Sequence, residues 1–393
     1  MSATLTLDAK AERQRFEAHC MADRRIWPWL GRALLDWGGI ALCMACSLWA
    51  FGQVEHWAPK ALCLAPGMWM VGVFQHRLAL LAHDAGHRTI CPNATLNDLL
   101  ATGLIYGPLL VSLNAWRMFH NEGHHPKIHT GTLRDPELVF KRVDNSWGLP
   151  IRRSKVTLFT GMALCGGALP GAIIFILWMA SPRCFARINQ LLMHLLKKSK
   201  DQDSDILPLR LRHLPSGRRA IARDLGFGLA QVLLRLALLT AFAYGVGQAL
   251  DYAAWPMLLA LWFGGYATGF WAVFRLRGYC EHVGAHTLSL CEPSPLWRFF
   301  VFPHGAWAHQ LHHEMPGLPF HRYRDVLRRR GSTGVSPGDV FRLFESSPPL
   351  ASGEVPAVDD DSNLMRRASL QGLLRVAVVD EPGPALAAAV EER

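Results

Sequence analysis

The amino-acid sequence predicts an all-α integral membrane protein with four transmembrane helices in two hairpins, in-plane helices and a cytoplasmic helical cap. Three observations carry this prediction. Half of the 393 residues are hydrophobic and only 18% are charged, whereas ordinary soluble domains carry about 25% charged residues. Several apolar stretches approach the roughly 20 residues that a helix needs to cross a bilayer. The Lys and Arg residues gather at particular ends of these stretches.

Four of the six apolar stretches are expected to cross the membrane. The expected spans are residues 31–52, 60–81, 236–250 and 257–274. The other two stretches, 95–113 and 156–180, contain Gly and Pro residues that interrupt a regular helix. Arg235 immediately precedes the third expected span. We expect its side chain to reach the cytoplasmic interface, because a cation at the centre of a span costs about 2.5–3.5 kcal/mol.

The distribution of cations gives the expected orientation. Residues 1–32 hold six Lys and Arg residues and residues 181–224 hold ten, whereas the connection 251–256 holds none. Because cytoplasmic segments carry an excess of Lys and Arg, the basic segments are expected in the cytoplasm. If residues 156–180 crossed the membrane, the ten cations that follow would lie outside. This stretch and 95–113 are therefore expected to be re-entrant or in-plane.

The chain is expected to divide into three parts. Residues 1–30 form a cytoplasmic N-terminal segment, and residues 31–345 form the membrane domain. Residues 346–393 begin with a Pro-, Ser- and Asp-rich sequence and are expected to be poorly ordered. The net charge of +10 suits anionic lipid headgroups better than nucleic acid, because the cations stand beside apolar segments and no nucleic-acid motif is present.

Histidines cluster after the apolar stretches, at positions that the orientation places on the cytoplasmic side. HDAGH follows the second expected span, HNEGHH follows an in-plane stretch, EHVGAH follows the fourth span, and HQLHH comes later. Randomly placed histidines would not sort to one face of a membrane. The candidate metal ligands are His83, His87, His120, His124, His125, His282, His309, His312 and His313.

The spacing of these histidines favours a shared metal site over a polar surface loop. Residues three and four apart lie on one face of a helix, so each cluster aims two or three imidazoles in one direction. Nine imidazoles exceed the four positions of a zinc ion but suit two ions in one pocket. Nitrogen donors with few carboxylates point to iron and oxygen chemistry, although imidazole also binds zinc, copper and nickel.

Acidic and aromatic residues beside the histidines are candidates for supporting roles. An acidic group can accept the second N–H of a ligating imidazole and so fix its orientation. The acidic candidates are Asp84, Glu122, Glu281 and Glu314. The candidates for lining an apolar substrate tunnel are Trp116, Phe119, Trp271 and Phe274. Solvated carboxylates and ordinary packing at the membrane interface are the competing interpretations.

The histidine clusters resemble the three histidine boxes of membrane fatty acid desaturases and related hydroxylases. RGYCEH resembles the Arg and Glu-His element that precedes the third box, and Asp135 and Pro136 of RDPE are similar to a pair that follows the second box. The resemblance extends over about residues 35–330. The HxxxHH spacing of the second box, in place of HxxHH, is a variant that leaves open which iron each of its histidines binds.

The resemblance implies that the nine histidines hold two non-haem irons. It further implies an oxidoreductase that uses O2 and two external electrons to desaturate a fatty-acyl chain by abstracting hydrogen from an unactivated C–H bond. A separate ferredoxin or cytochrome is the expected electron donor. The expected partners are a lipid or acyl substrate, the bilayer and this donor, with no nucleic acid.

Other functions remain open at this stage. A hydroxylase or ketolase of a lipid, carotenoid or alkyl chain would use the same di-iron site. A non-enzymatic transporter would place its polar groups inside the spans, whereas these histidines follow the span ends. A membrane zinc hydrolase is disfavoured because the sequence contains no HExxH motif.

Overall fold

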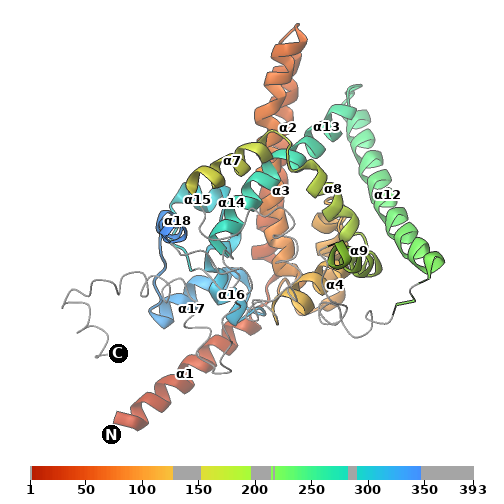
Figure 1. Ribbon diagram of the computed structural model, residues 1–393. Coiled ribbons are helices and arrows are strands. Elements are labelled where there is room, and N and C mark those ends of the chain that lie inside the picture. Colours follow the sequence, from red (N-terminus) through yellow and green to blue (C-terminus); the bar gives the residue numbers. More distant parts are fainter. Residues whose placement is uncertain (1, 127–151, 196–213, 216, 282–289, 347–393) are drawn as a thin grey trace.

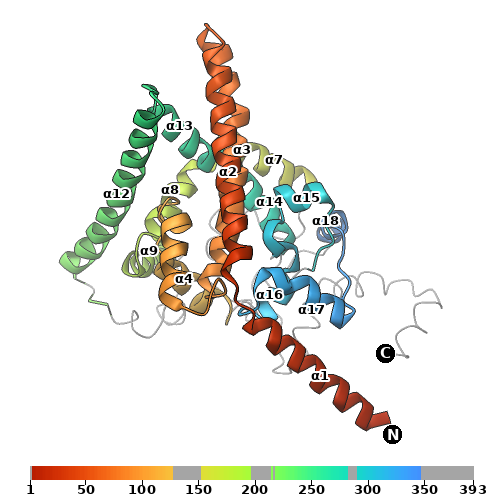
Figure 2. The same ribbon diagram turned by 180° about the vertical axis from the view of Figure 1, so that it is seen from behind.

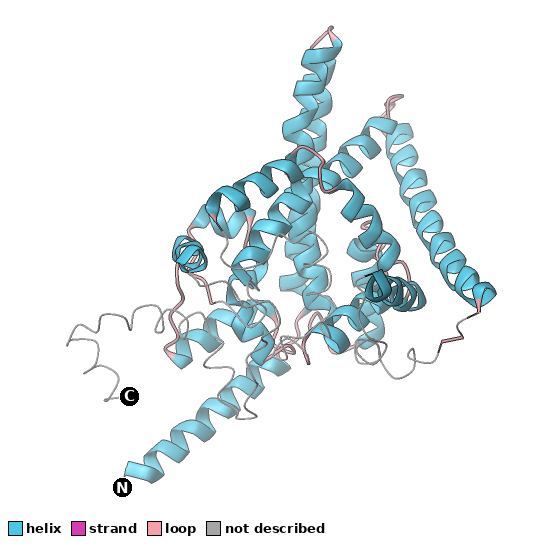
Figure 3. Ribbon diagram, viewed as in Figure 1, coloured by secondary structure: helices cyan, strands magenta, loops and turns pink. Residues whose placement is uncertain are grey.

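The described part of the protein is almost entirely helical in this computed structural model (Figure 3). The structure describes residues 2–126, 152–195, 214–215, 217–281 and 290–346. Within these ranges the only extended pairing is one isolated bridge between Cys291 and Val335. The all-α class is therefore confirmed. Apart from residue 346, the expected C-terminal tail lies outside the described residues.

The first hairpin consists of α2 (Ile26–Gly52) and α3 (Trp57–Gly86), which lie side by side (Figure 1). α2 is long and apolar enough to cross a bilayer, and it exposes large side chains such as Trp49, as a surface in contact with lipid would. The two helices approach closely because Gly39 has no side chain: a Cβ atom there would lie 2.4 Å from the ring of Phe74. α3 contains the expected second span, but among the described residues it is not one of the three helices that are long and apolar enough to cross a membrane.

The second hairpin consists of α12 (Arg218–Ala249) and a helical run over Pro256–Glu281, both apolar enough to cross a membrane. α12 begins well before the expected span at 236, because Arg, Ala and Leu continue the helix through the basic segment. Arg235 therefore lies within the helix instead of at its start. Its guanidinium donates to the carbonyl oxygens of Leu110 (3.4 Å) and Ala180 (3.3 Å), and the expected reach of this side chain to the cytoplasmic interface stays a prediction.

The helical run Pro256–Glu281 comprises α13 (Pro256–Gly265), the π-helical turn η4 (Tyr266–Phe270) and α14 (Trp271–Glu281). It packs against α3 through glycines. A Cβ atom at Gly72 would lie 2.3 Å from the carbonyl oxygen of Gly265, so neither backbone could approach as closely with larger residues. This contact brings α14 alongside the histidine-bearing part of α3.

The two stretches that were expected to lie in the membrane plane form short, interrupted helices. Residues 94–106 form α4 (Ala94–Ala101) and the π-helical turn η1 (Thr102–Tyr106). α7 (Arg153–Leu164) and α8 (Leu169–Trp178) meet at 77°, which describes either a broken span or a re-entrant loop. The break falls at Gly166, whose φ of +83° favours glycine. The in-plane course of these helices and the four-span topology stay predictions.

A cap of short helices packs against α3 and α14, beside the histidine-bearing end of α3. It contains α15 (Pro295–Phe300), η5 (Pro303–Ala308), α16 (His309–Glu314), η6 (Phe320–Arg322), α17 (Tyr323–Arg330) and α18 (Pro337–Ser346). α1 (Ser2–Ala22) extends from the same end and contacts α17 (Figure 2). Arg330 joins them through an ion pair of 2.7 Å with Glu17. The α2–α3 and α12–α13 connections lie at the opposite end (Figure 1).

Candidate metal centre

The three histidine boxes lie on three different helices that meet at the capped end of the molecule. The first box closes α3, the second lies on the π-helical turn η2 (Met118–His124), and the third forms α16. Eight of the nine predicted ligands lie together there: His83, His87, His120, His124, His125, His309, His312 and His313. The ninth, His282, lies outside the described residues.

The rings form two groups that can each surround one metal ion. The first group is His83, His87, His120 and His312, and the second is His124, His309 and His313. Within each group, one ring nitrogen per residue lies within 4.8 Å of the others. Because a metal–nitrogen bond to imidazole is about 2.0–2.1 Å, donors on one ion are at most about 4.2 Å apart. Small movements of the rings would therefore close either group on an ion.

His125 lies between the two groups. Its Nε2 atom is 3.0 Å from Nε2 of His120 and 3.0 Å from Nε2 of His312, both in the first group. Its ring also stacks on His313 of the second group, with centroids 4.3 Å apart. One ring nitrogen carries either a hydrogen or a lone pair, so it cannot make good hydrogen bonds to two other ring nitrogens at once. Three converging Nε2 atoms are the arrangement that a shared metal ion would stabilise.

The π-helical turn η2 accounts for the unusual spacing of the second box. In an α-helix, five residues advance about 500°, which would turn His125 roughly 140° away from His120. Here the backbone N–H of His125 instead donates to the carbonyl oxygen of His120 at 3.0 Å, the i→i+5 bond of a π-helix. The wider turn accommodates one extra residue. It lets both His124 and His125 face the same side as His120.

Five of the eight described candidate ligands are buried and the other three are half-buried, and burial favours the neutral form of several of them. His120, His124 and His312 are each at most 5% exposed. Burial lowers the pKa of His120 and of His312 well below the usual value for imidazole, and lowers that of His87 to about 3. Neutral imidazole is the form that binds a metal ion. Within the described residues, Nε2 of His83 and Nε2 of His87 are buried without a hydrogen-bond partner. Buried polar atoms normally have a partner, and a bound metal ion would supply one here.

Two side chains outside the boxes contact the second nitrogens of ligating rings. Glu281, at the end of α14, lies 3.7 Å from Nδ1 of His309 and is itself held by Arg277 at 3.1 Å. The hydroxyl of Tyr323 lies 3.3 Å from Nδ1 of His312. Contacts of this kind fix ring orientation and the position of the ring proton. Glu281 was a candidate from the sequence, whereas nothing in the sequence around Tyr323 identified it.

The other acidic candidates have different partners. Asp84 accepts hydrogen bonds from the hydroxyl of Thr89 (3.0 Å) and the backbone N–H of Phe320 (3.4 Å), which ties the first box to the cap. Glu314 forms an ion pair with Arg330. Glu122 is exposed and lines a cleft beside the second box.

Of the four aromatic candidates, Trp116 lies against the histidines. Its ring stacks on His120 with centroids 4.5 Å apart and contacts His83 at 5.4 Å. Trp116 is thus the aromatic residue placed to shield the first group from water. The other three make aromatic contacts within the helical bundle, Phe119 with Trp178, Trp271 with Phe175, and Phe274 with Phe270.

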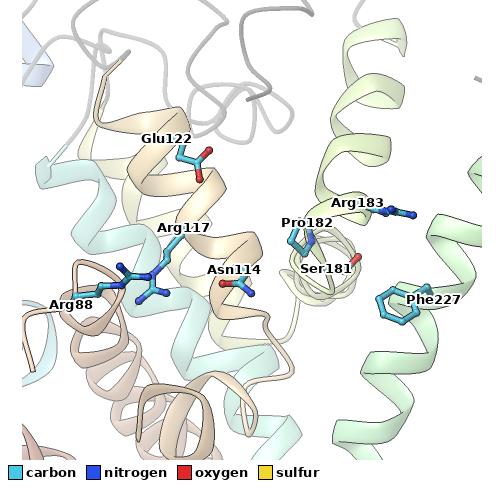
Figure 4. A pocket seen from close by; sticks show the side chains of 8 residues that line it. All are labelled: Arg88, Asn114, Arg117, Glu122, Ser181, Pro182, Arg183 and Phe227. Atoms are coloured by element: carbon cyan, nitrogen blue, oxygen red, sulfur yellow. The ribbon is translucent and has the colours of Figure 1, made fainter. Parts of the chain in front are cut away.

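A cleft of about 550 Å3 lies beside the second box (Figure 4). It is lined by Arg88, Asn114, Arg117, Glu122, Ser181, Pro182, Arg183 and Phe227. Three guanidinium groups against one carboxylate give the cleft a positive balance. Arg117 is engaged by Asp98 at 2.6 Å and Arg183 by Asp224 at 3.2 Å, whereas Arg88 is exposed.

The fold and the histidine cluster define a class: a helical membrane protein with a histidine-rich candidate metal centre. A family model described as fatty acid desaturase matches residues 55–334, and the chain belongs to this family. Membership indicates a membrane oxidoreductase that acts on fatty-acyl chains, in agreement with the resemblance of the histidine boxes. The comparisons with curated proteins and with solved structures gave no match.

Proposed function

We propose that this protein is an O2-dependent di-iron enzyme that desaturates a fatty-acyl chain. The observation that carries the proposal is the convergence of eight imidazoles, as two groups with His125 between them, in a member of the fatty acid desaturase family. Imidazole nitrogen suits iron, and the burial of the rings provides the neutral donors that binding requires. We propose His282, which the structure does not describe, as the ninth ligand.

The proposed reaction requires redox chemistry at a bound metal ion. A saturated acyl C–H bond has no useful acidity, so side chains acting as acids and bases cannot break it. Bound iron would supply redox chemistry with O2, and the protein must position the acyl chain and exclude water. Trp116 covers the first histidine group. Tyr323 contacts Nδ1 of His312, and Glu281 lies near Nδ1 of His309, on the ring nitrogens that would face away from the metal.

The proposed orientation places this centre on the cytoplasmic face. The support is the excess of Lys and Arg in residues 1–32 and 181–224, together with the position of the histidine boxes at the capped end. Electrons would come from a separate ferredoxin or cytochrome in the cytoplasm or at the membrane surface.

The products of expressed protein provide the direct test. Lipids from a host with and without this chain are compared by mass spectrometry, and metal is measured in the purified protein. We expect acyl chains that have lost two hydrogens and about two irons per chain. Products that have gained one oxygen would assign the hydroxylase alternative. Zinc, or no metal, together with unchanged lipids would contradict the proposal.

The arginine-lined cleft is proposed to hold the anionic head of the acyl substrate. We expect Arg88→Asn to raise KM about 10-fold with little change in kcat, because a charge-assisted hydrogen bond is worth about 1.5–3 kcal/mol. Asn is chosen because it tolerates the φ of +60° at this position. The control is Arg324→Asn, which removes an exposed cation from α17, outside the cleft. Equal KM values for Arg88→Asn and the control would contradict this assignment.

A further inference from the structure

We propose that Asp36, a carboxylate within the first span, is a positioning residue for the third histidine box. Asp36 lies in the apolar helix α2 and is 1% exposed. An ionisable residue inside a membrane segment is costly and usually serves a function. The inference rests on the proposed function, because it concerns how the same metal centre is held.

Both oxygens of Asp36 bind donors from other parts of the chain. Oδ1 accepts from Nε of Arg77 on α3 at 2.7 Å, and Oδ2 contacts Nε2 of His304 at 2.6 Å. A carboxylate can only accept, so Nε2 of His304 carries the hydrogen. Arg77 also donates to the carbonyl oxygen of Phe299 at 2.7 Å. Asp36 is thus the centre of a buried network that joins both helices of the first hairpin to the segment before the third box.

His304 occupies a turn that requires a restraint of this kind. Its φ of +52° is left-handed, which is uncommon for residues other than glycine, and Gly305 follows with a φ of +84°. These two residues redirect the chain just before His309, the first histidine of the third box. The bond from Asp36 holds the His304 side chain and so favours this turn over relaxed alternatives.

The turn packs against Tyr323, which contacts a candidate metal ligand. A Cβ atom at Gly305 would lie 2.8 Å from the ring of Tyr323, whose hydroxyl in turn contacts Nδ1 of His312. His304 and Gly305 also line a cavity of about 20 Å3 together with His83, His309 and His312. This volume is close to that of one water molecule, so the turn and the ligating rings border the same small space.

The structure therefore links Asp36 to His312 through His304, Gly305 and Tyr323. The network acts through other residues and does not touch the metal positions. We expect its loss to lower metal affinity about 10-fold or more, the range found for other groups that orient metal ligands. The loss of this network should also change the absorption spectrum of a bound metal ion, because the histidines of the third box would be oriented differently.

Two variants of the full-length protein in detergent test the inference. Asp36→Asn keeps the shape of the side chain and removes its charge. His304→Asn removes the ring and keeps the Asp36–Arg77 pair, and Asn tolerates the left-handed backbone. The matched control is Asp224→Asn: Asp224 is also 1% exposed and paired with a buried arginine, Arg187, at 2.8 Å, but this pair joins α12 to α9 (Pro182–Leu195).

The measurements are iron retention against a chelator and the visible absorption spectrum of cobalt-substituted protein. We expect both test variants to lose iron about 10-fold more readily and to show shifted cobalt bands, with Asp224→Asn unchanged in both. If Asp36→Asn does not fold, His304→Asn decides alone. Iron retention and spectra equal to wild type in His304→Asn overturn the inference. A wild-type protein that binds no metal would instead overturn the proposed function.

Discussion

Replacement of His125 by alanine is expected to reduce turnover about 10³-fold or more and to release metal from the protein. The His125 ring contacts both groups, with Nε2 atoms of His120 and His312 at 3.0 Å and a stacked contact with His313. Groups that only orient metal ligands already cost about 10–100-fold when removed, so the loss of a ligand itself should cost more. Iron content and turnover of the purified variant measure the effect.

His56→Ala is the matched control for this experiment. His56 is exposed and lies before α3, at the end of the helix opposite the first box. We expect this variant to retain wild-type iron content and turnover. A His125→Ala protein that keeps two irons and works within tenfold of wild type would show that His125 only packs between the groups.

The first and third histidine boxes could be placed from the sequence because their spacing is that of an α-helix. His83 and His87 are four residues apart, and His309, His312 and His313 are three and four apart, so each set necessarily shares a face. The convergence of the boxes was also foreseeable, since each follows an apolar stretch on the side that the cations mark as cytoplasmic.

The supporting residues were harder to foresee, for two different reasons. Asp36 carried a signal that was available in the sequence, a charged residue within an apolar run. Its meaning depended on Arg77 and His304, which are remote in sequence and meet it only in the folded chain. Tyr323 carried no signal, because a tyrosine at the start of a short basic helix is ordinary.

The start of α12 shows a different limit. Hydropathy places the apolar centre of a span, but the helix begins at Arg218 because Arg, Ala and Leu are all strong helix formers. Within the helix, Arg235 donates to Gln231 on the same helix and to the carbonyl oxygens of Leu110 and Ala180. These two carbonyl groups belong to short segments whose positions depend on tertiary packing.

Helical spacing placed His120 and His124 of the second box on one face but did not place His125, and this leads to the second large effect. The turn η2 closes with a bond from His125 N–H to the carbonyl oxygen of His120, so it accommodates one residue more than an α-helical turn.

Deletion of Glu122, which is exposed, converts HNEGHH to HNGHH. In the shortened box, the two later histidines are the third and fourth residues after His120. In an α-helix they would lie about 60° short of a full turn and about 40° past it, so both would face the same side as His120.

The shortened box is therefore expected to form an α-helical turn that aims its two later histidines as the π-helical turn does. We expect the deletion variant to retain about two irons and measurable turnover. Insertion of one alanine after Glu122 gives HNEAGHH, with four residues between His120 and the histidine pair. Neither turn accommodates this spacing, so the insertion should abolish iron binding and turnover. Glu122→Ala, with unchanged length, separates the effect of spacing from that of the side chain. The deletion variant could instead lose iron as completely as the insertion variant. That result would show that the π-helical turn does more than accommodate the extra residue.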